Sequence, residues 1–213
     1  MNISILPDAD TLNVPDLLDA DGLLKLLPAA AYDEIPWQNL RLFCHIHSRY
    51  GLPTVELVQW LKAQIARRAA IEIGSGAGDL AFHLGIPATD NRMQEWPRIK
   101  RHYKVAGQPT IKYPDFVRSL DAVGAVHTLK PQVVIASWVT QWIDGDGPVR
   151  CGNPHGVKEE QILALGVTYI LIGNIAVHGD KQIMGLPHQE HNLPFLRSRA
   201  HQPELNRVWV WNP

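Results

Sequence analysis

The sequence has little of what defines several specialised protein classes. It holds two cysteines in 213 residues, Cys44 and Cys151, which lie far apart and form no metal-ligand spacing. Two cysteines are too few to staple a domain of this size, which favours a reducing compartment. No run approaches the ~20 apolar residues that a membrane span needs, and the N-terminus has no basic segment followed by an apolar one. We therefore expect a cytoplasmic protein without a membrane anchor.

A large excess of charge of either sign is also absent. The formal net charge is -1, so no global positive field attracts phosphate backbones, and nucleic acid is a disfavoured partner. Hydrophobic residues make up 46% and charged residues 19%, a globular balance. The length suits one core of roughly 150 to 200 residues with an appendage.

The ten histidines form no recognisable metal-binding pattern. His188 and His191 lie three apart, whereas the metalloprotease pattern is H-E-x-x-H. We interpret this stretch as a surface loop and predict no metal site.

The apolar pattern predicts helices that alternate with strands. Helices are expected over residues 16–27 (closed by Pro28), 37–50, 54–68 and 79–84. Strands are expected at residues 69–73, 86–89, 116–120, 133–137, 169–173 and 207–211, and residues 175–206 should mix an edge strand with loops. Because parallel neighbours need a crossover connection, this alternation predicts an α/β fold with a mostly parallel twisted sheet and helices on both faces. Residues 1–50 form an N-terminal helical extension or lid in this interpretation.

A glycine-rich turn follows the strand expected at residues 69–73. Gly74, Gly76 and Gly78 are spaced G-x-G-x-G, which lets the backbone turn tightly and approach a ligand. The dinucleotide-binding fingerprint is G-x-G-x-x-G, and Asp79 stands where that pattern has glycine or alanine. This difference disfavours a nicotinamide cofactor. A ligand-free strand-to-helix connection is the other interpretation of the same residues.

With Glu72 in front, the stretch Ile71-Glu-Ile-Gly-Ser-Gly-Ala-Gly-Asp-Leu80 resembles the first motif of class I S-adenosylmethionine-dependent methyltransferases. The resemblance covers residues 50 to 175 and implies a Rossmann-like domain, placed at residues 51–213, that binds S-adenosylmethionine. It implies an acid on the ribose hydroxyls at the end of the second strand, where Asp90 falls. It also implies an acid on the adenine amine after the third strand, where Asp121-Ala122 falls.

The resemblance thus implies a set of cofactor-binding residues. They are Glu72, Gly74, Ser75, Gly76, Gly78, Asp90, Asn91, Asp121, Ala122 and Ser137. Helix capping or turn formation, common tasks for aspartate, is the alternative interpretation of the two aspartates.

Catalytic residues are less well indicated. Trp138 and Trp142 lie four apart near the expected cleft and either cage an acceptor or pack in the core. His178 is a candidate general base, although a lone histidine is often structural. The fourth strand lacks the Asp/Asn-Pro-Pro-Tyr/Phe signature, and no Pro-Cys dipeptide is present, so methylation of DNA base amines or of cytosine C5 is disfavoured.

Three functions remain open at this point. The leading one is an S-adenosylmethionine-dependent methyltransferase acting on a small-molecule or protein acceptor. The second is a non-catalytic module that keeps the methyltransferase-like fold and binds a partner. The third, a nicotinamide-dependent oxidoreductase, is disfavoured by the glycine spacing. The oligomeric state is not indicated.

Overall fold

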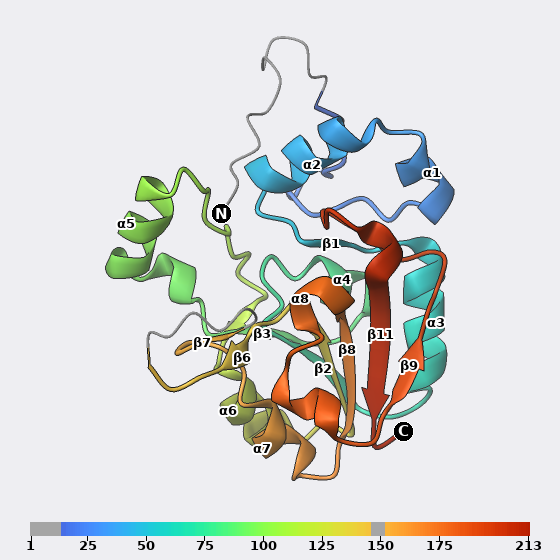
Figure 1. Ribbon diagram of the computed structural model, residues 1–213, viewed down its shortest axis with the longest axis vertical. Coiled ribbons are helices and arrows are strands. Elements are labelled where there is room, and N and C mark those ends of the chain that lie inside the picture. The colour runs from blue at the N-terminus through green and yellow to red at the C-terminus, as the bar shows by residue number, and fades with distance from the viewer. Residues whose placement is uncertain (1–13, 146–151) are drawn as a thin grey trace.

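A computed structural model of the chain describes residues 14–145 and 152–213, so Cys151 lies outside the described residues. It is an α/β structure built on a seven-stranded sheet in the order β4-β3-β2-β5-β8-β11-β9 (Figure 1). The strands are β2 (Ala70–Ile73), β3 (Ala88–Asp90), β4 (Arg118–Ser119), β5 (Val133–Ser137), β8 (Thr168–Asn174), β9 (Gln189–His191) and β11 (Asn206–Trp211). The first five strands of this order are parallel, and β11 pairs antiparallel with both β8 and β9.

Helices connect the strands and precede them. They are α1 (Ala29–Asp33), α2 (Trp37–Ile46), α3 (Val55–Ile65), α4 (Asp79–Leu84), α5 (Pro97–Val105), α6 (Ala122–Leu129), α7 (Glu159–Leu163) and α8 (Ile175–His178), with short 3-10 helices η2 (Met93–Glu95), η3 (Gln182–Gly185) and η4 (Pro203–Leu205). Two small sheets lie apart from the main one: β1 (Gly51–Leu52) with β10 (Arg197–Ser198), and β6 (Gln141–Trp142) with β7 (Gly152–Asn153). In the described part of the chain, no helix has the length and apolar character that crossing a membrane requires.

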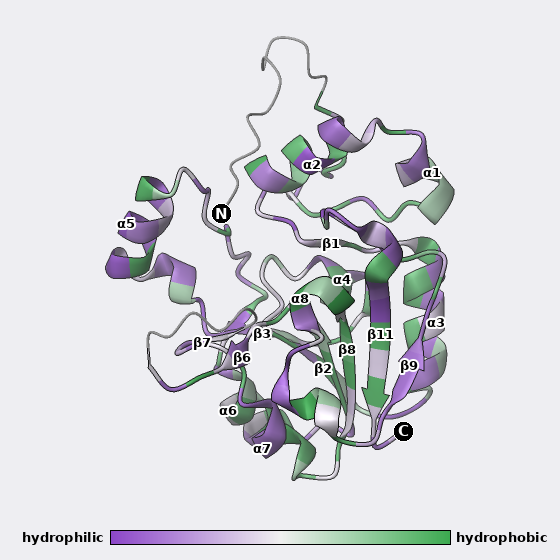
Figure 2. Ribbon diagram, viewed as in Figure 1, coloured by the Kyte–Doolittle hydropathy of each residue, from purple (hydrophilic) through white to green (hydrophobic). Residues whose placement is uncertain are grey.

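The sheet is buried on both faces because its strands alternate side chains between two hydrophobic clusters. Val134 and Ala136 of β5 pack with residues of α6 and α7, whereas Val133 and Ile135 pack with residues of α3 and α4. Successive residues of a strand point to opposite faces, so a continuous apolar run such as β5 is expected when helices cover both sides. Figure 2 shows the hydrophobic colouring along these central strands.

Most central elements agree with the sequence prediction. The strand predicted at residues 133–137 has those bounds. Those predicted at 69–73 and 207–211 differ from β2 and β11 by one residue at one end, and that predicted at 169–173 differs from β8 by one residue at each end. The edge strand expected within residues 175–206 is β9, at one border of the main sheet, so the interpretation of the stretch from His188 to His191 as a surface loop is wrong for residues 189–191. Thr54 caps α3 as predicted, since its Oγ1 accepts a hydrogen bond of 3.1 Å from the Leu57 N–H.

The helix predicted over residues 16–27, with Pro28 closing it, is wrong. Leu18 and Leu24 pair there as an isolated antiparallel bridge. Between them, the Asp19 carboxylate accepts two backbone N–H hydrogen bonds of 2.9 Å, a local alternative to helical hydrogen bonding. Pro28 instead precedes the first turn of α1.

Other predicted bounds also need correction. The helix predicted to end at Tyr50 ends at Ile46, because Ser48 adopts a left-handed backbone with φ 54°. The strand predicted at residues 116–120 has two residues, in keeping with its place at the sheet border. The strand predicted at residues 86–89 starts two residues later and ends at Asp90, which makes this aspartate part of the sheet.

Candidate functional site

A cavity of about 910 Å³ lies at the carboxyl ends of the parallel strands. Its wall includes Ser75 and Gly76 after β2, Asp90 of β3, and Ser137 of β5. Residues that follow β4 and residues near the end of β8 also line it. A volume of this size falls within the range of small-molecule and cofactor sites. We therefore take this cavity as the candidate site.

The glycine turn forms the floor of this site, between β2 and α4. Gly74, Gly76 and Gly78 have φ of 56°, 58° and 78°, a left-handed conformation that favours glycine. A Cβ on Gly74 would lie 2.7 Å from the Val139 side chain, and one on Gly78 would lie 2.7 Å from Phe116. Both backbone conformation and close packing thus require glycine in the turn. Gly78 supports the turn but does not line the cavity.

Glu72 is buried beneath the turn and ties β2 to α4. Its Oε2 accepts a hydrogen bond of 2.8 Å from the Ala81 N–H, and the Thr89 hydroxyl donates to its backbone carbonyl at 3.0 Å. Burial raises the pKa of Glu72 to about 8, with the charges of Asp79 and Asp90 acting in the same direction. The side chain still reaches the cavity wall.

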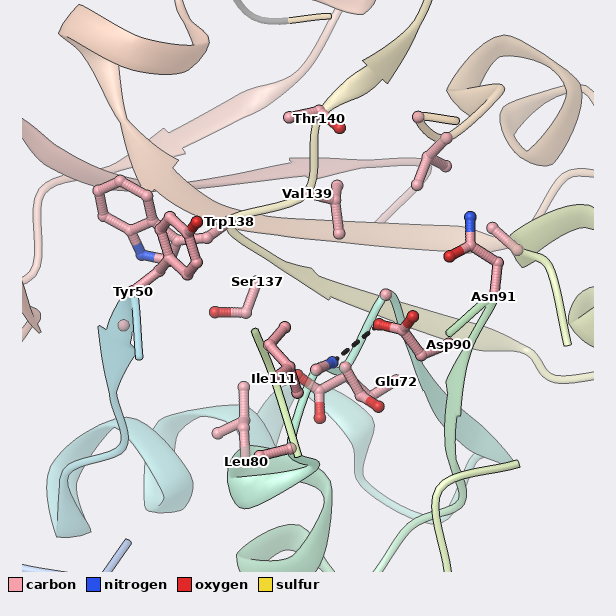
Figure 3. A pocket seen from close by; sticks show the side chains of 18 of the residues that line it. Tyr50, Glu72, Leu80, Asp90, Asn91, Ile111, Ser137, Trp138, Val139 and Thr140 are labelled. Atoms are coloured by element: carbon pink, nitrogen blue, oxygen red, sulfur yellow. Dashed lines mark hydrogen bonds between the residues drawn. The ribbon is translucent and has the colours of Figure 1, made fainter. Parts of the chain in front are cut away.

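Asp90 extends into the cavity from the end of β3 (Figure 3). Its Oδ2 accepts a hydrogen bond of 3.0 Å from the Gly76 N–H, and its Oδ1 accepts one of 2.7 Å from the Arg92 N–H. Burial raises the pKa of the Asp90 carboxyl, and these backbone hydrogen bonds and that of the Tyr113 side chain oppose the increase. The carboxylate is therefore held in one orientation against the glycine turn.

Asn91 follows Asp90 on the same side of the cavity (Figure 3). Its Nδ2 donates to the His155 carbonyl at 3.1 Å, while its Oδ1 accepts from the Met93 N–H at 3.0 Å. The side chain thereby joins the end of β3 to the segment after β7, so its polar atoms have structural partners.

Asp121 and Ala122 also line the cavity, at the start of α6. Asp121 is the N-cap of this helix, because its Oδ1 accepts a hydrogen bond of 2.9 Å from the Gly124 N–H. The capping interpretation is thus confirmed for Asp121. Asp121 is therefore both the cap of α6 and a residue of the cavity wall.

Tyr50 and Trp138 form the opposite side of the cavity from Asp90 (Figure 3). Their ring centroids are 6.4 Å apart with an interplanar angle of 32°. Trp138 follows Ser137 of β5 and has a φ of 60°, a conformation that a bulky residue rarely adopts and that functional sites often retain. Gly51 lets the indole approach, since a Cβ there would lie 3.0 Å from it.

The two predicted tryptophans have separate partners. Trp142 is 38% exposed, and the Lys158 ammonium lies 4.8 Å from its ring centroid. Among the described residues, no ring contact joins it to Trp138, whose ring neighbours are Tyr50 and His178. Both tryptophans line the cavity, but the aromatic pair is Tyr50 with Trp138.

His178 is buried behind the cavity wall and does not line it. Its Nδ1 accepts a hydrogen bond of 3.0 Å from the Asn174 N–H, and its ring packs edge-on against Trp138. Burial lowers the pKa of His178 to about 3, which makes it a weak base at neutral pH. This placement argues against the role of general base and favours a structural role behind Trp138.

Sequence reasoning missed an ion pair at the glycine end of the cavity. Arg49 Nε lies 2.7 Å from Asp79 Oδ2, with both side chains at most 10% exposed. The Leu24 N–H donates to the other oxygen of Asp79 at 2.8 Å. Arg49 precedes the Tyr50-Gly-Leu-Pro-Thr54 stretch, and no local spacing signals its pairing with a residue thirty positions later.

Within residues 14–145 and 152–213, no group of three or more His, Cys, Asp or Glu residues is arranged to hold a metal ion.

Comparison of the chain with models of protein families gives no match, and comparison with curated proteins gives none either.

Proposed function

We propose that the protein is an S-adenosylmethionine-dependent methyltransferase with a Rossmann-like fold. One observation carries this proposal: the glycine turn after β2 and the carboxylate of Asp90 line the same cavity and are hydrogen-bonded to each other. The resemblance assigns the glycine turn to the methionine end of S-adenosylmethionine and Asp90 to its ribose hydroxyls.

The position of the cavity in the sheet supports the proposal. The chain runs outward from β2 to β3 and β4, then crosses back to β5 and β8 on the other side of β2. In open α/β sheets, ligands bind at the carboxyl ends of the strands where the order reverses. That point lies between β2 and β5, where the glycine turn and Ser137 meet the cavity.

The residues present fit the cofactor. The Ser75 hydroxyl oxygen is buried in the turn and has no hydrogen-bond partner among the described residues, which leaves it free for a polar ligand group. Asp90 would hold ribose hydroxyls through charge-assisted hydrogen bonds. The turn from Gly74 to Gly78, with Glu72 below and Arg49 beside it, would hold the methionine end.

Two features weigh against a dinucleotide cofactor. Asp79 occupies the place where the dinucleotide fingerprint has a small residue for close helix packing, and here its side chain is committed to a buried ion pair with Arg49. The dinucleotide-binding sheet is mostly parallel and has the strand order 3-2-1-4-5-6, so its sixth strand lies next to the fifth. In this chain the last strand, β11, lies antiparallel next to β8.

The chain's own task in methyl transfer is positioning. S-adenosylmethionine supplies an electrophilic methyl group, so the protein has to orient the acceptor and exclude water. Tyr50 and Trp138 lie on the side of the cavity opposite Asp90 (Figure 3), and we assign acceptor contact to them. The strained backbone of Trp138 fixes its ring in this wall.

A non-catalytic binding module is the second candidate, and one observation favours it. His178, the base candidate, is buried behind Trp138 and does not line the cavity. A protein that binds the cofactor but not an acceptor would have the same cofactor side of the cavity. Turnover of a methylated product separates this candidate from the enzyme.

Calorimetric titration of the purified protein with S-adenosylmethionine, S-adenosylhomocysteine and NADH tests the proposal. We expect micromolar binding of the first two, about -8 kcal/mol, and no heat from NADH. Binding of NADH alone, or of none of the three, would overturn it.

A further inference from the structure

Helix α5 (Pro97–Val105) projects from the body of the protein (Figure 1), and Gln94 and Trp96, just before it, line the cavity. None of its residues is buried. Only Ile99 and Tyr103 are partly covered, and Tyr103 reaches the cavity wall. Most helices of globular proteins are stabilised by burying an apolar face, so this helix has unusually little to hold it in place.

The helix carries a concentration of positive charge that the net charge of the chain conceals. Residues 92–112 contain six basic residues and one acidic residue, a net charge of +5 in a chain whose formal net charge is -1. Its acidic residue, Glu95, is paired with Arg92 at 2.7 Å. The net charge, which made nucleic acid a disfavoured partner, hides this local excess of positive charge.

The four basic side chains of α5 are exposed and lie next to one another. They are Arg98, Lys100, Arg101 and Lys104. None of them pairs with a carboxylate within the described residues. Arg98 with Arg101 and Lys100 with Lys104 are neighbours on the helix surface, and like charges at these spacings destabilise a helix. An anionic partner would remove this repulsion.

Two exposed tryptophans line the cavity, and one of them directly precedes α5. Trp96, just before α5, is 45% exposed and packs edge-on against His155 at 5.2 Å. His155 follows β7, the partner strand of β6, which carries the exposed Trp142. Both tryptophans line the cavity. We define the basic rim as the set of exposed side chains of Trp96, Arg98, Lys100, Arg101, Lys104 and Trp142.

We infer that the basic rim binds single-stranded nucleic acid and leads it to the cavity. Cationic side chains that follow a backbone, combined with exposed aromatic rings on which bases stack, are the features that bind single strands. An acidic protein or an anionic membrane would use the charges, but neither offers a planar group at every repeat of an anionic backbone, as a single strand does for Trp96 and Trp142. A duplex has its bases stacked inside and offers none to the Tyr50–Trp138 wall.

Binding of nucleic acid to the basic rim does not require the cofactor. This inference can therefore hold where the methyltransferase proposal fails, and the methyltransferase proposal can hold where this inference fails. Where both hold, the acceptor is a group on an unpaired base or its sugar. The cofactor titration and a nucleic-acid titration therefore fail independently.

Fluorescence anisotropy with a labelled oligothymidylate of about 20 nucleotides tests the inference on the full chain. We expect binding that weakens as KCl rises from about 50 to 200 mM, because phosphate contacts release counterions. A duplex of equal length, polyglutamate and vesicles rich in phosphatidylserine should compete at least about tenfold less well. Absence of binding at low salt, or equal competition by any of the three, would overturn the inference.

A pair of matched variants locates the site. Lys100→Gln with Lys104→Gln removes two charges from the basic rim, and Lys62→Gln with Arg67→Gln removes two exposed charges from α3 and the residues after it. The first should weaken binding about tenfold or more at low salt and reduce the log–log salt slope by about 1.4, at ~0.7 per lost contact. The second should leave both unchanged. Equal effects of the two variants would contradict a specific surface.

Stacking is tested by Trp96→Ala. The loss of one ring should weaken oligothymidylate binding by about 5-fold or more. The slope of log affinity against log salt should be the same in the variant as in the unchanged protein. An unaltered affinity would show that only the charges bind, which contradicts the assignment to single-stranded nucleic acid. Circular dichroism of each variant confirms that α5 and the sheet remain folded.

Discussion

The carboxylate of Asp90 accepts a hydrogen bond of 3.0 Å from the backbone N–H of Gly76. This bond joins the end of β3 to the turn after its neighbour β2. A second bond, from the Arg92 N–H, fixes the other oxygen. Because two backbone donors hold it, the carboxylate is oriented before any ligand arrives, which reduces the entropic cost of binding.

We predict that Asp90→Ala weakens S-adenosylmethionine binding by about 1.5 to 3 kcal/mol, the size of hydrogen bonds to a charged group. Calorimetric titration measures this loss. Asp180→Ala, which removes an exposed aspartate, is the control and should keep the affinity. A folded Asp90→Ala protein that binds as well as the unchanged one would refute the ribose role.

Gly74→Ala should destabilise the fold by about 1 to 3 kcal/mol, because it combines left-handed strain with a close contact. The new Cβ would lie 2.7 Å from Val139 Cγ1 but 3.7 Å from its Cβ. The cost of Gly74→Ala should therefore be smaller in a Val139→Ala background, as measured by urea unfolding in a double-mutant cycle.

Gly85→Ala is the matched control for backbone strain. Gly85 also has a positive φ, 72°, but a Cβ there would meet nothing within 4 Å. Its cost should be about 1 kcal/mol and independent of Val139. Additive behaviour of Gly74 and Val139 would contradict the proposed contact.

The centre of the sheet was predictable because each central strand carries its own burial signal. The five residues of β5 are an unbroken apolar and small run between polar segments, and the glycine triplet marks the turn after β2. Local sequence determines these features, since continuous apolar runs are required in strands covered on both faces.

The remaining features depend on partners far along the chain. Arg49 is paired with Asp79, and β1 pairs with β10 almost 150 residues later. The pairing of Tyr50 with Trp138 likewise arises from the backbone turn at Trp138, which apolar periodicity does not reveal. Sequence reasoning therefore gave the glycine turn, Asp90 and Trp138, and missed the pairing of Trp138 with Tyr50.

A buried ion pair between Lys181 and Glu159 supplies a stability prediction. Lys181 Nζ donates to both carboxylate oxygens at 2.8 Å, and the Tyr169 hydroxyl adds a third hydrogen bond. Lys181→Met leaves a buried carboxylate without its cation, which should cost about 3 to 5 kcal/mol in urea unfolding. Adding Glu159→Gln should restore part of this loss. A cost below about 1 kcal/mol, as for a surface pair, would contradict the burial of the pair.

The last prediction concerns pH and Glu72. Burial raises its pKa to about 8 in the folded protein, whereas an unfolded glutamate titrates near 4.3. Between these values the folded state keeps a proton that the unfolded state has lost, so the contribution of Glu72 to the free energy of unfolding decreases as pH rises. Glu72→Gln retains an acceptor for the Ala81 N–H but does not titrate.

The stability of Glu72→Gln relative to the unchanged protein should therefore increase from pH 5 to pH 8 in urea unfolding. The difference between the two proteins isolates Glu72 from Asp79, Asp90 and Glu159, whose pKa values burial also raises. Glu204→Gln, at an exposed glutamate, should show a constant difference over the same range. A constant difference for Glu72→Gln as well would mean that the carboxylate beneath the glycine turn is ionised in the folded protein at both pH values.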